Sequence, residues 1–132
     1  MIYTARHISQ GIARDSGAVA AFAGDPANLP LWAAGLSAGI RLVEGKWVTD
    51  SPMGVVEVAF VGPIEHGVLD HDVTLPDGTV VHNPLRVLRN GDGSEVVFTL
   101  YRLPGVTDEE FERDASLVAA DLARLRSLLE YN

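Results

Sequence analysis

The C-terminal stretch 107–131, TDEEFERDASLVAADLARLRSLLEY, decides the fold that we expect for this chain. It begins with a capping-box pattern, in which the Thr107 hydroxyl accepts an N–H of the first turn and Glu110 reaches back to the cap. Apolar residues then recur at steps of four and three, which places them on one face of a helix: Phe111, Ala115, Val118, Leu122, Leu125 and Leu129. Such a helix would be about 37 Å long at about 1.5 Å per residue, so it needs a broad curved sheet to cover.

Composition limits the function classes that the chain can serve. A length of 132 residues with 47% hydrophobic residues predicts one domain, 1–132, with a real core. The net charge of −8 repels phosphate backbones and anionic lipid surfaces, so we expect no nucleic-acid partner and no membrane partner. The chain has no cysteine, and its first ten residues have no apolar run typical of a signal peptide. A cytoplasmic protein is the expectation.

The middle of the chain has the texture of strands and turns, after a first strand at 3–13 and two short helices. The helices are predicted to begin at Asp15 or Ser16 and at Asp25-Pro26, and Gly24 separates them. Turn residues then divide six further strands, at about 40–43, 46–50, 54–61, 66–75, 79–89 and 95–103.

Two hairpins fix which residues share a face of the sheet. A two-residue loop at Gly91-Asp92 pairs Leu85 with Phe98. For the preceding hairpin we prefer a three-residue loop, Asp77-Gly78-Thr79, because it separates apolar from polar residues and pairs His71 with Leu85. It also sets Asp70 opposite Arg86 on the outer face, and Pro84 should mark a bulge or a bend.

The order of elements resembles the helix-grip fold of the START/polyketide cyclase–dehydrase superfamily, which includes plant pathogenesis-related allergens and lipid-transfer domains. The resemblance is carried by the segments Val19-Ala20-Ala21-Phe22 and Asp25-Pro26-Ala27-Asn28-Leu29-Pro30-Leu31-Trp32 and by the closing helix. It implies an α+β fold in which a seven-stranded curved antiparallel sheet wraps the C-terminal helix, with Trp32 helping to wall a cavity. The cone-shaped fold of nuclear transport factor-like proteins is the nearest rival, but it places its long helix first.

His71 and Asn83 are the candidate polar anchors of a ligand site. Both interrupt an otherwise apolar inner face, where they are diagonal neighbours in the preferred register. They can be a polar pair that satisfies itself in the core, or they can hold a ligand in a mostly apolar cavity. Asp70 cannot orient His71, because adjacent strand residues point to opposite faces. The predicted walls of the cavity are Trp32, Leu69, Val73, Leu85, Phe98 and Leu100.

No pattern in the chain predicts a metal site or a nucleophile. In the preferred register His71 faces inward and His82 outward, so the two cannot share an ion. The stretch 35–39, GLSAG, matches a nucleophile elbow, but a helix precedes it and a strand follows, which is the reverse of what the elbow needs. We therefore expect a helix-to-strand loop there, with no metal and no cofactor.

Two classes of function follow from the resemblance. The first is binding of a small hydrophobic or aromatic molecule, such as a lipid or a polyketide, between sheet and helix, with cyclase- or dehydratase-like activity left open because no acid–base pair is evident. The second is a non-enzymatic interaction module, like the co-chaperone branch of the superfamily, with a collapsed cavity. A homodimer is compatible with either.

Overall fold

A computed structural model describes residues 1–52 and 54–131 of the chain. The fold begins with one strand and a series of short helical segments: β1 (Thr4–Ile12), α1 (Ser16–Ala23), η1 (Pro26–Asn28), α2 (Leu29–Trp32) and η2 (Ala34–Leu36). Strands follow, interrupted by one 3-10 turn: β2 (Arg41–Val43), β3 (Lys46–Ser51), β4 (Gly54–Phe60), η3 (Ile64–His66), β5 (His71–Thr74), β6 (Val80–Asn83), β7 (Leu85–Asn90) and β8 (Gly93–Arg102). The chain closes with the long helix α3 (Asp108–Glu130).

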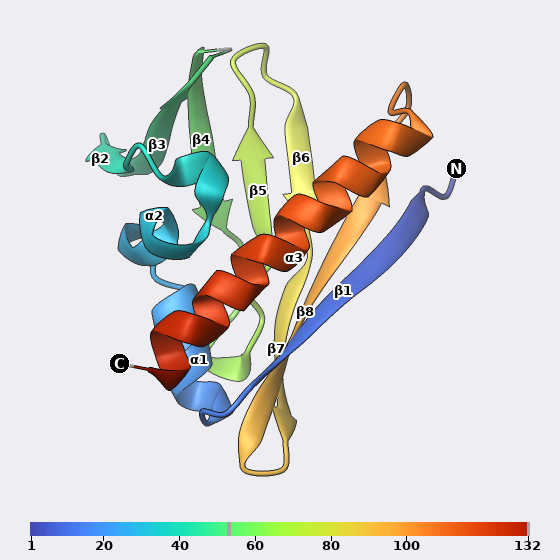
Figure 1. Ribbon diagram of the computed structural model, residues 1–132. Helices are drawn as coiled ribbons and strands as arrows, with labels where there is room; N and C mark the ends of the chain where they lie inside the picture. Colours follow the sequence, from blue (N-terminus) through green and yellow to red (C-terminus); the bar gives the residue numbers. More distant parts are fainter. Residues whose placement is uncertain (53, 132) are drawn as a thin grey trace.

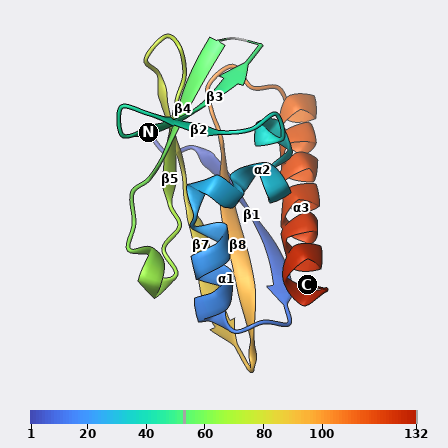
Figure 2. The same cartoon turned by 90° about the vertical axis from the view of Figure 1, so that its left-hand side faces the viewer.

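Helix α3 forms one layer and the strands form the other. In Figure 1 the helix crosses diagonally in front of the strands, and Figure 2 shows α1 and α2 on the side between the two layers. The predicted start of the helix is confirmed, because Thr107 Oγ1 accepts from the N–H of Glu110 at 3.1 Å and Glu110 Oε1 accepts from the N–H of Thr107 at 3.0 Å. Its apolar stripe is buried except at Val118, which is half-buried.

The strands number eight in the described residues and form two sheets, so the expectation of seven strands in one sheet is wrong. One sheet has the order β1-β8-β7 and the other the order β2-β3-β4-β5-β6. The predicted strand 79–89 is divided at Pro84 into β6 and β7, which belong to different sheets. Proline has no N–H to give to a ladder, so the pairing stops there. The sequence placed the bend at Pro84 but did not reveal that it separates two sheets.

The register of the β5–β6 hairpin differs from the preferred one by two residues. His71 lies opposite Asn83, and not opposite Leu85. The loop is Pro76-Asp77-Gly78, closed by the N–H of Leu75 bonding the carbonyl of Thr79 at 2.8 Å. Proline at the first loop position and a glycine with φ of +89° at the third suit a type I turn that ends in a left-handed residue. A shift of two keeps every side chain on its predicted face, whereas a shift of one would have reversed them. The β7–β8 pairing of Leu85 with Phe98 is confirmed.

The core fills one end of the space between the layers. Its fully buried side chains come from α1, the segment before β5, β7, β8 and α3: Val19, Leu69, Leu85, Val96, Leu122 and Leu125. Helix α1 approaches this core closely at Gly24, where an added Cβ would lie 2.9 Å from Leu69 Cδ2. The two leucines predicted to wall a cavity, Leu69 and Leu85, are therefore packed beneath α1.

One ladder bond next to Pro84 is replaced by two side-chain bonds. In a regular antiparallel pair, Leu69 and Leu85 would exchange both N–H···O bonds. The N–H of Leu69 does donate to the carbonyl of Leu85 at 2.8 Å. The N–H of Leu85, however, donates to Asp70 Oδ1 at 3.0 Å, and the carbonyl of Leu69 accepts from His71 Nδ1 at 3.0 Å. Asp70 and His71 thus satisfy the two backbone groups that the bend separates.

Asp70 is also held by an ion pair. Its two oxygens accept from Arg86 Nε and Nη2, both at 2.9 Å, although only 12% of the Asp70 side chain is exposed. This bidentate bond to Arg86 is the main reason that the pKa of Asp70 lies below its ordinary value, against a smaller opposing effect of burial. The side chains of Asp70 and Arg86 do meet, but the predicted register that set them opposite each other is wrong, because Arg86 lies opposite Val68 in the ladder.

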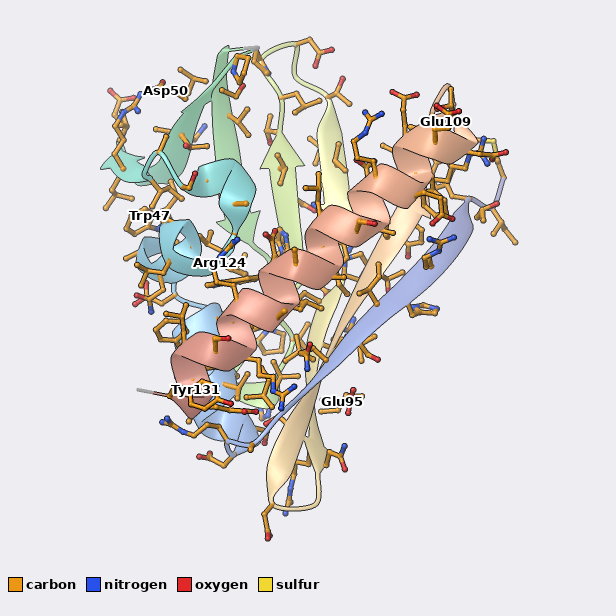
Figure 3. All side chains as sticks on the ribbon, viewed as in Figure 1. Trp47, Asp50, Glu95, Glu109, Arg124 and Tyr131 are labelled. Atoms are coloured by element: carbon orange, nitrogen blue, oxygen red, sulfur yellow. The ribbon has the colours of Figure 1, made fainter. Side chains whose placement is uncertain are left out.

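We predict that Asp70→Ala lowers the free energy of unfolding by about 1–3 kcal/mol, because it leaves the buried N–H of Leu85 without an acceptor. Asp50→Ala is the matched control. Asp50 also forms a bidentate pair with an arginine, Arg41, but 71% of its side chain is exposed (Figure 3), so its loss should cost at most about 1 kcal/mol. Urea unfolding followed by circular dichroism measures both. Equal losses would show that the Leu85 contact contributes nothing.

Candidate ligand-binding cavity

A cavity of about 300 Å³ lies between the strands and α3, next to the buried core. The short segments α2 and η2, the strands β3, β4, β5 and β8, and helix α3 all contribute to its walls. The lining is mostly apolar: Leu29, Trp32, Ala33, Gly35, Leu36, Thr49, Ser51, Val56, Val58, His71, Val73, Phe98, Val118 and Asp121. Val118 is the half-buried member of the α3 stripe because it borders this cavity. A mostly apolar pocket with a few polar groups is the usual composition of a small-molecule site.

His71 is the polar side chain that β5 contributes to the cavity wall. Its ring lies between two aromatic rings, with centroids 5.5 Å from that of Phe60 and 6.2 Å from that of Phe98, both in edge-on geometry. The carbonyl of Leu69 can only accept, so the bond to Nδ1 requires a proton on that nitrogen. In the neutral ring the other nitrogen, Nε2, then carries the lone pair. Burial among these apolar groups lowers the pKa of His71, so the neutral form is favoured.

Two side chains of α3 fasten the α2–η2 wall to the helix. Asp121 Oδ1 accepts from the N–H of Ala34 at 3.1 Å, and Arg124 Nη1 donates to the carbonyl of Trp32 at 3.1 Å. In Figure 3 the Arg124 side chain lies where α3 faces α2. Partial burial raises the pKa of Asp121, while the bond from Ala34 and the charge of Arg124 act in the opposite direction. These bonds position Trp32 and η2 over the cavity.

The structure brings four of the eight residues predicted for the site to the cavity: Trp32, His71, Val73 and Phe98. Leu69 and Leu85 lie in the core, and Leu100 lies outside the lining. Asn83 is also outside the lining; its Nδ2 donates to the carbonyl of Val81 at 3.4 Å. His71 and Asn83 each bond a carbonyl two residues earlier in their own strand, so they are not a pair that satisfies itself.

Three polar lining residues were missed by the sequence analysis: Thr49, Ser51 and Asp121. A signal for the first two exists, since alternation along 46–51 puts Trp47, Thr49 and Ser51 on one face of the strand. Asp121 directly precedes Leu122 and follows Val118 by three positions, which places it at the border of the apolar stripe. That position could have indicated an acidic residue near the site.

The described residues offer neither a metal site nor a membrane-spanning helix. Residues 1–52 and 54–131 contain no group of three or more His, Asp or Glu side chains arranged to hold a metal ion. Within the same ranges, no helix combines the length and the apolar character needed to cross a bilayer.

Comparison with known proteins supports the fold at low sequence identity. No protein-family model matches the chain, and no curated protein matches its sequence. A START superfamily protein from Mycobacterium smegmatis has a TM-score of 0.67 at 11% identity, over 96% of this chain and 97% of its own. The Aha1 dimer from Colwellia psychrerythraea gives 0.73 at 16% identity, over 96% of each chain. DynU16, from the dynemicin biosynthetic locus, gives 0.68 at 17% identity, over 96% of this chain and 47% of its own.

These TM-scores, each over 96% of this chain, show that the three structures share its fold. The chain has the α+β helix-grip fold of the START superfamily, as the sequence predicted. The likeness covers nearly the whole chain, and at these identities it concerns the fold alone.

We predict that His71 makes the free energy of unfolding depend on pH below the ordinary histidine value of 6.5. Its pKa is lowered in the folded state, so the unfolded chain binds the proton first as the pH falls. Stability is therefore complete above pH 6.5 and decreases below it, by at most about 1.4 kcal/mol per pH unit, until the folded pKa is reached. The variant His71→Leu should lose this part of the slope in urea unfolding between pH 7.5 and pH 5. Parallel curves for the two proteins would contradict the prediction.

Proposed function

We propose that this protein binds a small hydrophobic or aromatic molecule in the cavity between its strands and α3, with His71 as polar anchor. The observation that supports this most is the cavity itself: about 300 Å³ of space lined mostly by apolar side chains, with one imidazole in its wall whose pKa burial lowers. Volumes of about 300 Å³ and above are typical of small-molecule sites, so this cavity suits a small ligand.

The alternative class is an interaction module with a collapsed interior. In such a protein we would expect side chains to fill this space. Side chains in a packed core leave few voids larger than a water molecule. Here Val118 and Asp121 on α3 face the cavity, as do Val56 and Val58 on β4, instead of meeting across it. The arrangement therefore favours ligand binding over a purely structural interior.

Binding is also favoured over catalysis. A cyclase or dehydratase moves protons, and this usually needs an acid and a base in suitable protonation states. The one imidazole at the cavity has its Nδ1 proton engaged by a backbone carbonyl, and the one carboxylate, Asp121, is engaged by the N–H of Ala34. Both groups serve to hold the backbone, so we assign the site a binding role without a cofactor.

The first test is a thermal-shift screen of the full chain against bicyclic aromatics, flavonoids, fatty acids and sterols. A ligand that binds only the folded state adds about 2.7 kcal/mol of stability at 100 times its Kd. We predict shifts for compounds of one to three rings and none for sterols, which exceed the cavity. If none of these compounds shifts the melting temperature, the proposal is wrong.

Val118→Trp provides the structural control for that screen. The larger side chain would occupy the cavity, so we predict that the variant folds but loses the shift seen with every ligand of the wild type. Leu117→Trp is the matched control, because Leu117 is adjacent on α3 but 54% exposed and outside the lining. It should keep the wild-type shifts. Loss of binding in both variants, or in neither, would place the ligand elsewhere.

A further inference from the structure

Most polar side chains of the cavity wall have no proton available for a ligand. Five residues of the lining carry polar side-chain atoms: Trp32, Thr49, Ser51, His71 and Asp121. In three of them the only proton, in the neutral form, is already given to a backbone carbonyl. Thr49 Oγ1 donates to Gly39 at 2.7 Å, Ser51 Oγ donates to Gly54 at 2.8 Å, and His71 Nδ1 donates to Leu69 at 3.0 Å.

The direction of these bonds is fixed by chemistry. A carbonyl oxygen has no proton to give, so each hydroxyl and the imidazole must be the donor. What remains at Thr49 and His71 is acceptor capacity, namely the lone pairs of the Thr49 hydroxyl oxygen and of His71 Nε2. Asp121, when ionised, is an acceptor only. Apart from Trp32, none of these polar groups has a proton to offer to a ligand when His71 is neutral and Asp121 is ionised.

Trp32 is the exception, because its indole N–H is a donor. This Nε1 is buried and has no hydrogen-bond partner among the described residues. It is also the one side-chain polar atom, within residues 1–52 and 54–131, that is both closed off and unpartnered. His71 Nε2 has no printed hydrogen-bond partner among the described residues, and it is not one of the closed-off atoms, so it keeps accessible surface on a residue that lines the cavity.

Charge acts in the same direction as the hydrogen-bonding groups. The lining contains no lysine and no arginine, and its only formally charged side chain is that of Asp121, which is paired with Arg124 Nη1 at 3.5 Å. The chain as a whole carries a net charge of −8. An anionic ligand would have to be desolvated beside an acceptor-rich wall without a counter-ion, which is costly.

We propose that the ligand carries a hydroxyl or N–H donor on a neutral apolar body of one or two rings, and that His71 Nε2 accepts a hydrogen bond from this donor. The proposal rests on the function proposed above and narrows it, because it disfavours carboxylates and ligands whose polar group is a ketone or an ether. The size follows from the cavity, which has the volume of about ten molecules of liquid water.

The test is isothermal titration calorimetry of the full chain at pH 7.5 with three naphthalenes that differ in one group. 2-Naphthol carries a donor, 2-methylnaphthalene has nearly the same shape without polar atoms, and 2-acetonaphthone carries only an acceptor. We expect 2-naphthol to bind at least about tenfold more tightly than 2-methylnaphthalene, which is about 1.4 kcal/mol. We expect 2-acetonaphthone to bind more weakly than either, because its carbonyl would meet lone pairs.

The outcomes separate this proposal from the one on which it rests. Equal affinity for 2-naphthol and 2-methylnaphthalene would overturn the donor requirement and leave hydrophobic binding in place. Tight binding of 2-acetonaphthone would also overturn it and would make Trp32 Nε1 the anchor. If none of the three binds, the proposed function fails and the donor requirement fails with it.

The variant His71→Phe tests the receiving atom. Phenylalanine keeps a ring between Phe60 and Phe98 but has no lone pair, so the preference for 2-naphthol over 2-methylnaphthalene should fall from about tenfold to about one. Binding of 2-methylnaphthalene by the variant would show that its cavity is intact. His66→Phe is the matched control, because His66 is exposed and outside the lining, and it should keep the preference. A preference that survives in His71→Phe would refute the role of Nε2.

Discussion

The site depends on one missing backbone hydrogen bond, from the N–H of Leu85 to the carbonyl of Leu69. Proline at position 84 ends one ladder, and the chain continues into a second sheet. A buried N–H and a buried carbonyl would each cost free energy if left unpaired. Asp70 takes the first and His71 takes the second, both from the strand that faces the bend. The hydrogen bond to the carbonyl of Leu69 thus determines that Nδ1 of His71 carries the proton.

That assignment connects the architecture of the strands to the chemistry of the cavity. With Nδ1 engaged, the imidazole presents a lone pair, and burial keeps it neutral. Asp70 and His71 are adjacent in sequence and point to opposite faces, so one residue serves the outer ion pair with Arg86 while the next serves the interior. The break in the ladder at Pro84 therefore also orients the candidate binding group, His71.

The inner face of the strands is divided into a packed end and an open end. Helix α1 fills the first, where Leu69, Leu85, Leu122 and Leu125 meet. Beyond α1, the smaller segments α2 and η2 cover the face less completely, and Asp121 and Arg124 hold them to α3 at a distance. The inner face of the strands thus lines the core where α1 covers it and the cavity where α2 and η2 cover it.

The sequence by itself determined the class of fold, the long capped helix, the bend at Pro84 and the inward direction of His71, because these follow from local periodicity and turn chemistry. The loop predicted between β5 and β6 was wrong, which shifted the register by two residues. Each side chain nevertheless stays on its predicted face of the sheet, because side chains alternate with a period of two. Only the tertiary structure decided that Leu69 and Leu85 are core, that Thr49, Ser51 and Asp121 line the cavity, and that the carbonyl of Leu69 accepts a hydrogen bond from His71 Nδ1. Local patterns show on which face of a strand or helix Thr49, Ser51 and Asp121 lie, but what each face meets depends on how segments distant in sequence pack.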